Sequence, residues 1–139
     1  MSSAMTYLWL DPESTVPNFT YGPARVVVIL EAEVSDEWQA RVSDWIVRSG
    51  CLYMMAWGIN CSAWDDSVDW ANIDQFGTDT IPETSFVVTT WHDDESLEEV
   101  FWYSKNCAFH SITNLERTII LHISKEEKRD EFLLAYGAA

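Results

Sequence analysis

Four side chains that could bind a divalent metal end apolar segments of the chain or directly follow them. They are two carboxylates and two imidazoles, Glu31, His92, Asp94 and His122. Carboxylate oxygens suit hard cations such as Mg²⁺ and Mn²⁺, and imidazole nitrogens suit Zn²⁺. If the apolar segments are parallel strands, their carboxyl ends meet at one edge of a sheet, where the four side chains could converge. This interpretation predicts a divalent-metal-dependent phosphoryl-transfer or hydrolytic enzyme.

A second set of residues indicates protein binding instead. It combines acids with tryptophans in two short segments, 65–70 and 91–95. Carboxylates attract a basic partner over a distance, and exposed indole rings often anchor protein interfaces. This interpretation predicts no cofactor and no catalytic residue. The predicted binding residues are Asp65, Asp66, Asp69, Trp70, Trp91, Asp93, Asp94 and Glu95.

The same acids also have a structural interpretation. Asp93 and Asp94 precede a predicted helix, and Asp65 and Asp66 lie at the start of another, where carboxylates accept hydrogen bonds from free backbone N–H groups. Cys61 precedes that second helix and could be a nucleophile, but the neighbouring aspartates oppose ionisation of its thiol. The sequence also lacks glycine-rich phosphate-binding motifs, G-x-S-x-G and H-E-x-x-H. These points weaken the enzyme hypothesis.

The distribution of charge favours a basic protein as the partner. The 139-residue chain has 23 Asp and Glu against 8 Lys and Arg, which gives a formal net charge of -15. No Lys or Arg occurs between Arg48 and Lys105, so most of the excess charge lies in the middle of the chain. This charge repels phosphate backbones and anionic membranes, which disfavours direct binding to nucleic acid or membrane. An acidic DNA mimic is a further alternative, which requires rows of exposed acids about 7 Å apart.

The expected compartment is the cytoplasm. The chain has 3 cysteines, an odd number without C-x-x-C spacing, and its N-terminal segment lacks a signal-peptide pattern. Its longest apolar run, 51–57, is far shorter than the roughly 20 residues that cross a bilayer.

Strands are predicted at four apolar runs, 25–31, 51–57, 86–91 and 118–123, and each is followed by a segment with helical spacing. The predicted helix caps are Ser35, Ser62, Asp93 or Asp94, and Ser124. The first 24 residues are rich in loop signals, and the short apolar segment 7–10 could add an edge strand.

The alternation of strands and helices predicts one α/β domain over residues 1–139. Parallel strands need right-handed crossovers, so we expect helices on both faces of the sheet and a three-layer sandwich. The expected order of the four strands is 2-1-3-4, as in flavodoxin-like sheets. The site would then lie at the carboxyl ends of the first and third strands.

Two sequence blocks carry a resemblance to a known family. W-G-I-N-C-S-A-W-D-D-S-V-D at 57–69 and T-T-W-H-D-D-E-S-L-E-E at 89–99 resemble signatures of a small bacterial α/β family with no established activity. This resemblance implies no catalytic residue. In size, acidity and α/β character the chain is also similar to barstar, whose acidic surface steers it to a basic partner.

The leading functional hypothesis is therefore an acidic protein-binding module in the cytoplasm. Its expected partner is a basic protein, and the expected role is that of an antitoxin or immunity protein that neutralises a bacterial toxin such as a nuclease.

Overall fold

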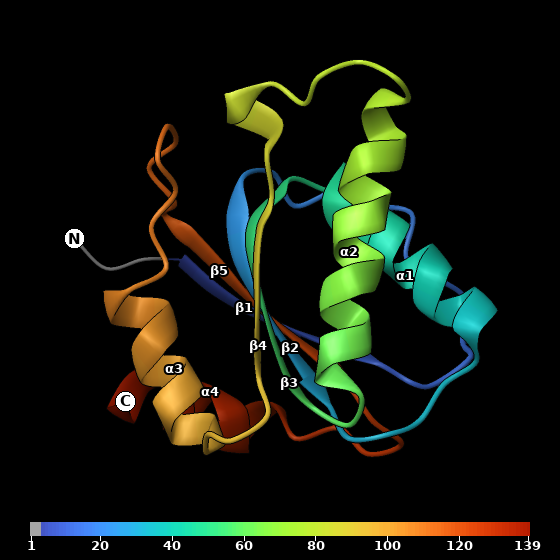
Figure 1. Ribbon diagram of the computed structural model, residues 1–139. Coiled ribbons are helices and arrows are strands. Elements are labelled where there is room, and N and C mark those ends of the chain that lie inside the picture. The colour runs from blue at the N-terminus through green and yellow to red at the C-terminus, as the bar shows by residue number, and fades with distance from the viewer. Residues whose placement is uncertain (1–3) are drawn as a thin grey trace.

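A parallel sheet of five strands forms the centre of the structure, a computed structural model that describes residues 4–139 (Figure 1). The strands are β1 (Ala4–Leu10), β2 (Ala24–Leu30), β3 (Cys51–Gly58), β4 (Val88–His92) and β5 (Arg117–Ile123). The helices are α1 (Asp36–Arg48), α2 (Cys61–Phe76), α3 (Leu97–Asn106) and α4 (Arg129–Ala138), and a 3₁₀ turn, η1, covers Glu83–Ser85. The predicted α/β class is confirmed, and the optional N-terminal strand is present as β1.

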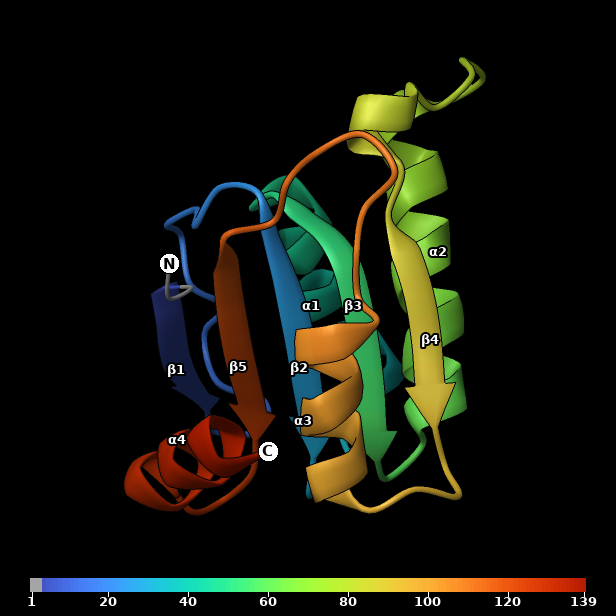
Figure 2. The same cartoon turned by 90° about the vertical axis from the view of Figure 1, so that its left-hand side faces the viewer.

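The strand order is β1-β5-β2-β3-β4, so the predicted order 2-1-3-4 is wrong (Figure 2). That order would place β4 beside β2, whereas β2 pairs with β3 and β5. Side-chain chemistry explains the difference. All seven residues of β2 and six of the seven in β5 are buried, while only one of the five residues of β4 is. The apolar strands occupy the centre, and the polar strand β4 is an edge.

Helices cover both faces of the sheet, as predicted. Helices α1 and α2 share one face with the loop 11–23, and α3 and α4 cover the other (Figures 1 and 2). Two buried indoles of α1 fix that loop, because Trp38 Nε1 donates to Ser14 O at 2.7 Å and Trp45 Nε1 donates to Phe19 O at 2.9 Å. The sheet and its two helical layers hold the strand ends in fixed positions.

Only one of the predicted helix caps, that of α1, is present in the structure. Ser35 caps α1 by accepting from Trp38 N at 3.2 Å, as predicted. Ser62 does not cap α2, because it lies within the helix. The helix begins at Cys61, after Asn60, which has a left-handed conformation with φ 58°. Ser124 does not cap α4, because that helix begins only at Arg129.

The cap of α3 also differs from the prediction. Ser96, not Asp93 or Asp94, accepts from Glu99 N at 3.2 Å. The two aspartates are therefore exposed in the loop before the helix, and capping does not account for them.

Within residues 4–139, none of the helices is long and apolar enough to cross a membrane.

Candidate functional site

The two acidic segments singled out in the sequence lie next to each other in space. Helix α2 is the connection between β3 and β4, and it packs beside β4. Its contact face carries Asp65, Asp69 and Asn72, which lie about one helical turn apart. Thr89 Oγ1 of β4 donates to Asp69 Oδ1 at 2.8 Å, and Asn72 bonds to the backbone of Ser85 and Val87.

Six of the eight predicted binding residues are exposed, two of them on α2 and four at the end of β4 and in the loop after it. Trp70 is 64% exposed and Trp91 is 50% exposed. We call the exposed group the acidic surface; it consists of Asp66, Trp70, Trp91, Asp93, Asp94 and Glu95. Because β4 is the last strand of the sheet, its outer backbone groups pair with no other strand of the described residues.

The other two predicted residues lie beneath this surface. Asp65 is buried and Asp69 is half-buried between α2 and β4. Burial raises the pKa of Asp65, and the nearby carboxylates of Asp69 and Asp66 raise it further. Burial also raises the pKa of Asp69. Asp65 Oδ1 has no hydrogen-bond partner among the described residues.

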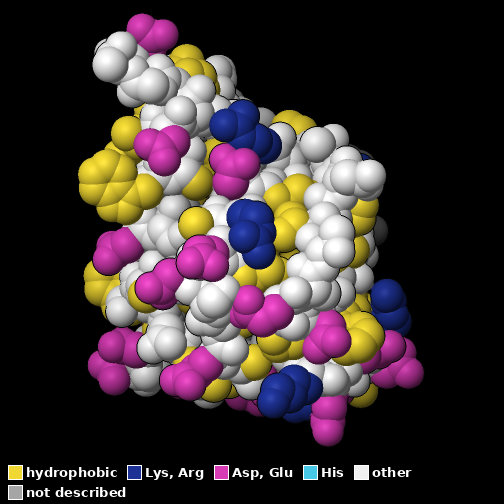
Figure 3. Space-filling view, turned by 90° about the vertical axis from the view of Figure 1, so that its right-hand side faces the viewer, with side chains coloured by type: hydrophobic (Ala, Val, Ile, Leu, Met, Phe, Trp, Pro, Cys, Tyr) yellow, Lys and Arg dark blue, Asp and Glu magenta, His cyan; other side chains and the backbone are white. Residues whose placement is uncertain are grey.

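The broad face over α1 and α2 is mixed in charge. Figure 3 shows carboxylates spread over this face, with hydrophobic side chains that reach the surface and a few Lys and Arg side chains between them. Helix α1 contributes such a cation at Arg48, which pairs with Asp44 at 2.8 Å. The region free of Lys and Arg is thus the α2–β4 side rather than the whole face.

The four residues of the metal hypothesis do not form one group. His122 Nε2 and Glu31 Oε1 are 2.6 Å apart, whereas His92 Nδ1 lies 2.7 Å from Glu95 Oε1. His122 and His92 are at the same level of the sheet but on strands separated by β2 and β3, which corresponds to about 14 Å. Asp94 is exposed in the loop after β4. Residues 4–139 contain no cluster of three or more His, Cys, Asp or Glu side chains that could hold a metal ion.

A chain of hydrogen-bonded polar residues, in which Tyr7 and His122 are buried and Glu31 and Lys128 are partly exposed, lies instead at the carboxyl ends of β2 and β5. Tyr7 OH is 2.7 Å from His122 Nδ1, and the other ring nitrogen of His122 contacts Glu31. Lys128 completes the chain, because its backbone N–H donates to Tyr7 OH at 2.9 Å and its Nζ lies 3.3 Å from Glu31. The sheet order places the topological switch point here, since β3 and β4 lie on one side of β2 and β5 and β1 on the other.

Burial and hydrogen bonding set the ionisation of this chain. Burial lowers the pKa of His122, and the neighbouring Glu31 opposes that shift only in part. Burial alone would raise the pKa of Glu31, but the hydrogen bonds from His122 and Lys128 lower it overall. At neutral pH, Glu31 is therefore ionised and the neighbouring His122 is neutral.

Sequence reasoning found Glu31 and His122 but missed Tyr7 and Lys128. Tyr7 joins the site only because β1 pairs with β5, so that it lies beside Ile120. Lys128 follows β5 and reaches Glu31 because β5 pairs with β2. No spacing in the sequence reveals a contact across more than a hundred residues. The one available signal was a tyrosine within an apolar segment.

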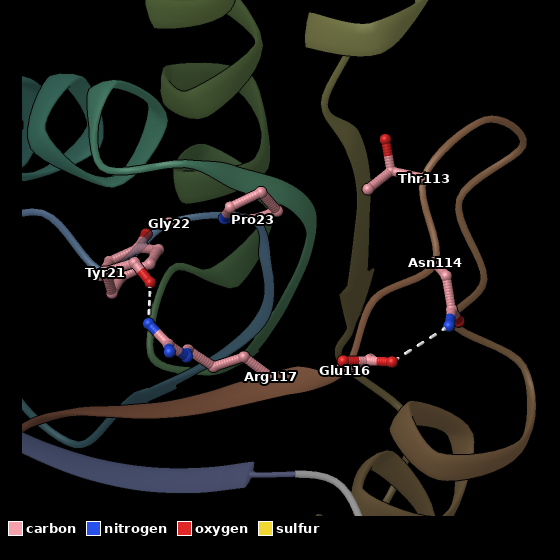
Figure 4. Close-up of a pocket in the computed structure, with 7 residues that line it drawn as sticks. All are labelled: Tyr21, Gly22, Pro23, Thr113, Asn114, Glu116 and Arg117. Atoms are coloured by element: carbon pink, nitrogen blue, oxygen red, sulfur yellow. Dashed lines mark hydrogen bonds between the residues drawn. The ribbon is translucent and has the colours of Figure 1, made fainter.

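A cavity lies at each end of the sheet. One, of about 500 Å³, lies beside the polar chain and is lined by Leu30, Glu31, Trp57, Gly58 and Ile59; we call it the rim crevice. The other, of about 400 Å³, lies at the amino ends of β2 and β5 (Figure 4). In Figure 4, Arg117 points to the backbone oxygen of Tyr21 and donates to it, and Asn114 bonds to Glu116. The polar groups of the second cavity thus bond to the protein itself.

Cys61 is not poised to act as a nucleophile. Its side chain is buried at the start of α2. Burial raises the pKa of the thiol, so it stays protonated at neutral pH.

The fold and these two regions define an α/β protein with a parallel sheet, helices on both faces and an acidic edge. Residues 5–139 match the family described as a domain of unknown function, DUF7684, and the chain belongs to that family. This agrees with the resemblance to a family without an established activity. Neither the curated proteins nor the solved structures contain a match to this chain.

Proposed function

We propose that the acidic surface captures a basic protein. One observation carries this proposal: two indoles that are at least half exposed and four exposed carboxylates belong to α2, to β4 and to the loop after β4, within a stretch of sequence, 49–104, that has no Lys or Arg. Large exposed aromatic rings are enriched where proteins bind one another, and carboxylates around them raise the rate of encounter with a cationic surface.

Two further features support a protein rather than another ligand. The outer edge of β4 offers unpaired backbone groups to an added strand, a common mode of protein recognition. A DNA mimic needs carboxylates spaced like phosphates, but it does not need indole rings between them. The combination of rings, acids and an open edge therefore favours a protein partner.

The finer proposal is an immunity protein that neutralises a toxin such as a nuclease in the cytoplasm. A nuclease binds nucleic acid through a basic face, which is complementary to the acidic surface. Blocking that face would prevent substrate binding without any catalytic residue in the inhibitor. This proposal adds a biological role to the more general proposal of a basic protein partner.

A charge-reversal experiment tests the surface. Asp66→Lys with Asp94→Lys should lower the association rate with the captured partner by about tenfold or more and flatten its dependence on salt. The matched control is Asp11→Lys with Glu126→Lys, which changes the net charge equally at exposed positions near β1 and β5. Its effect should stay within about threefold, because screening weakens distant charges.

The partner is first isolated from a bacterial lysate on the immobilised wild-type protein, and rates are then measured by surface plasmon resonance. Trp91→Ala should mainly increase the dissociation rate, because it removes a contact rather than a steering charge. Equal effects of the two double variants, or a partner that is indifferent to both, would show that the acidic surface is not the binding site.

A further inference from the structure

The rim crevice is an open crevice at the carboxyl ends of β2 and β3, next to the switch point between β2 and β5. Its floor is backbone, because Ile59 N donates to Leu30 O at 2.9 Å and a Cβ at Gly58 would lie 2.2 Å from that same oxygen. Its volume of about 500 Å³ is within the range of small-molecule sites. The carboxyl ends of the strands form the edge at which open parallel sheets usually bind ligands.

The single charged group that lines the crevice is Glu31. Its carboxylate is 29% exposed, and His122 fixes it from the buried side through a bond of 2.6 Å. His122 is itself held by Tyr7, so the carboxylate has a defined orientation. A fixed, ionised and partly exposed carboxylate is a binding group for a cation.

The rest of the lining is apolar and also fixed. Trp57 Nε1 donates to Glu95 O at 2.8 Å, which holds the indole in place. Ile59 is 40% exposed and extends the apolar wall. An aromatic ring near a carboxylate favours an ammonium or guanidinium group with a short apolar arm.

Most helix N-termini at this rim disfavour an anionic ligand. The first turns of α1, α3 and α4 carry acidic side chains, such as Asp36 and Glu98, whereas the first turn of α2, which begins at Cys61, carries none. The cations Lys125 and Arg129 belong to the segment after β5, on the other side of β2 from Trp57 and Ile59. Among the described Lys and Arg side chains, only Lys128 bonds to a residue that lines the crevice, Glu31.

We propose that the rim crevice binds a small organic cation, an alkylammonium or alkylguanidinium, with its head at Glu31 and its arm against Trp57 and Ile59. Lys128 already shows that the carboxylate accepts an ammonium group, since its Nζ lies 3.3 Å from Glu31. Lys128 is then an internal competitor that an incoming cation replaces.

The test is a titration of the ¹⁵N-labelled full chain with butylguanidinium and butylammonium, followed through the indole N–H signal of Trp57. Sodium butyrate at equal ionic strength is the anionic control. We expect a saturable shift with the cations and none with butyrate. Glu31→Gln should weaken binding by at least about tenfold, because the charge-assisted contact is lost. The matched control Glu33→Gln, two residues further along the same loop, should leave the affinity unchanged.

Lys128→Gln tests the same site in the opposite direction and keeps Glu31 intact. It should tighten cation binding by about threefold, because the competing ammonium group is removed. The proposal is overturned if the cations give no saturable shift, if butyrate gives the same shift, or if Lys128→Gln leaves the affinity unchanged. None of these measurements uses the basic partner protein, so this failure is distinguishable from failure of the acidic surface.

Discussion

The buried position of Asp65 disfavours the charged form of its carboxyl group. It is buried between α2 and β4, and its Oδ1 has no partner among the described residues. Thr89 has a single hydroxyl proton, which it donates to Asp69 one helical turn away. Asp65 therefore has little compensation for the water that it loses on folding, which is why burial raises its pKa.

Replacing Asp65 with Asn should stabilise the fold at pH 7 by up to about 1 kcal/mol. A raised folded-state pKa means that the folded protein keeps this proton at pH values where the unfolded chain has released it. The wild type thus loses stability as the pH rises above the ordinary value of 3.8. The advantage of Asp65→Asn should consequently shrink as the pH is lowered from 7 toward 4.

Urea unfolding at several pH values measures this effect, with Asp66→Asn as the control at the exposed neighbouring position. A lower stability of Asp65→Asn than of wild type at pH 7 would mean that the buried carboxylate makes a favourable interaction in the folded protein.

At the scale of elements, the turn from β3 into α2 depends on a glycine that no other residue can replace without movement. Gly58 has φ +105°, and a Cβ there would lie 2.2 Å from Leu30 O. Gly77, at the end of α2, also has positive φ, +60°, but a Cβ there would meet no atom within 4 Å. A comparison of alanine substitutions at the two positions therefore distinguishes the energetic cost of backbone strain from that of a steric clash.

We expect Gly58→Ala to destabilise the protein by roughly 3 kcal/mol and Gly77→Ala by about 1 kcal/mol, because only the first adds a clash to the strain. Urea unfolding midpoints give both values. If Gly58→Ala is too unstable to purify, its thermal stability in lysate is compared with that of Gly77→Ala. Similar losses of stability in the two variants would contradict this prediction. They would mean that the ends of β2 and β3 can move apart to make room for the Cβ at position 58 at little cost in free energy.

The positions of the strands could be predicted from the sequence, but their order could not. Apolar runs mark where each strand lies to within about two residues, because burial on both faces demands them. The order follows from a comparison between strands, in which the polar V-T-T-W-H of β4 is less suited to the centre than the T-I-I-L-H-I of β5. The apolar stripe of α3, with Val100 and Phe101 buried, also follows from its helical spacing.

Both candidate regions depend on strand neighbours that the sequence did not predict. Segments 65–70 and 91–95 come together because α2 joins the neighbouring strands β3 and β4, which the expected order separated by β2. The contact of His122 with Tyr7 depends on the pairing of β1 with β5, which joins residues 115 positions apart. Residue spacing has no means of predicting that contact.

For the whole molecule, the net charge of -15 acts against the compact state. Of the described carboxylates, only Asp44 and Glu31 lie within 4.0 Å of a Lys or Arg nitrogen. The remaining acids repel one another through solvent, where dissolved ions can screen them.

Added salt should therefore stabilise the protein. Between about 20 mM and 500 mM NaCl, we expect the free energy of unfolding to rise by on the order of 1 kcal/mol. Thermal and urea unfolding measure this, and KCl should have the same effect as NaCl. A much larger effect of MgCl₂ at equal ionic strength would contradict simple screening, since it would require a specific site for the divalent ion.

The pairing of β1 with β5 also determines when the sheet can be completed during synthesis. Ala4–Leu10 is synthesised more than a hundred residues before Arg117–Ile123, the strand beside it in the sheet. The units β2-α1-β3 and β3-α2-β4 connect strands that are neighbours in both sequence and space, so they can form while the chain is still growing. The apolar side chains of β1 are covered only when β5 has been made, and this long-range step slows folding. Strand β1 is thus synthesised before β2, β3 and β4 but takes its place in the sheet after them.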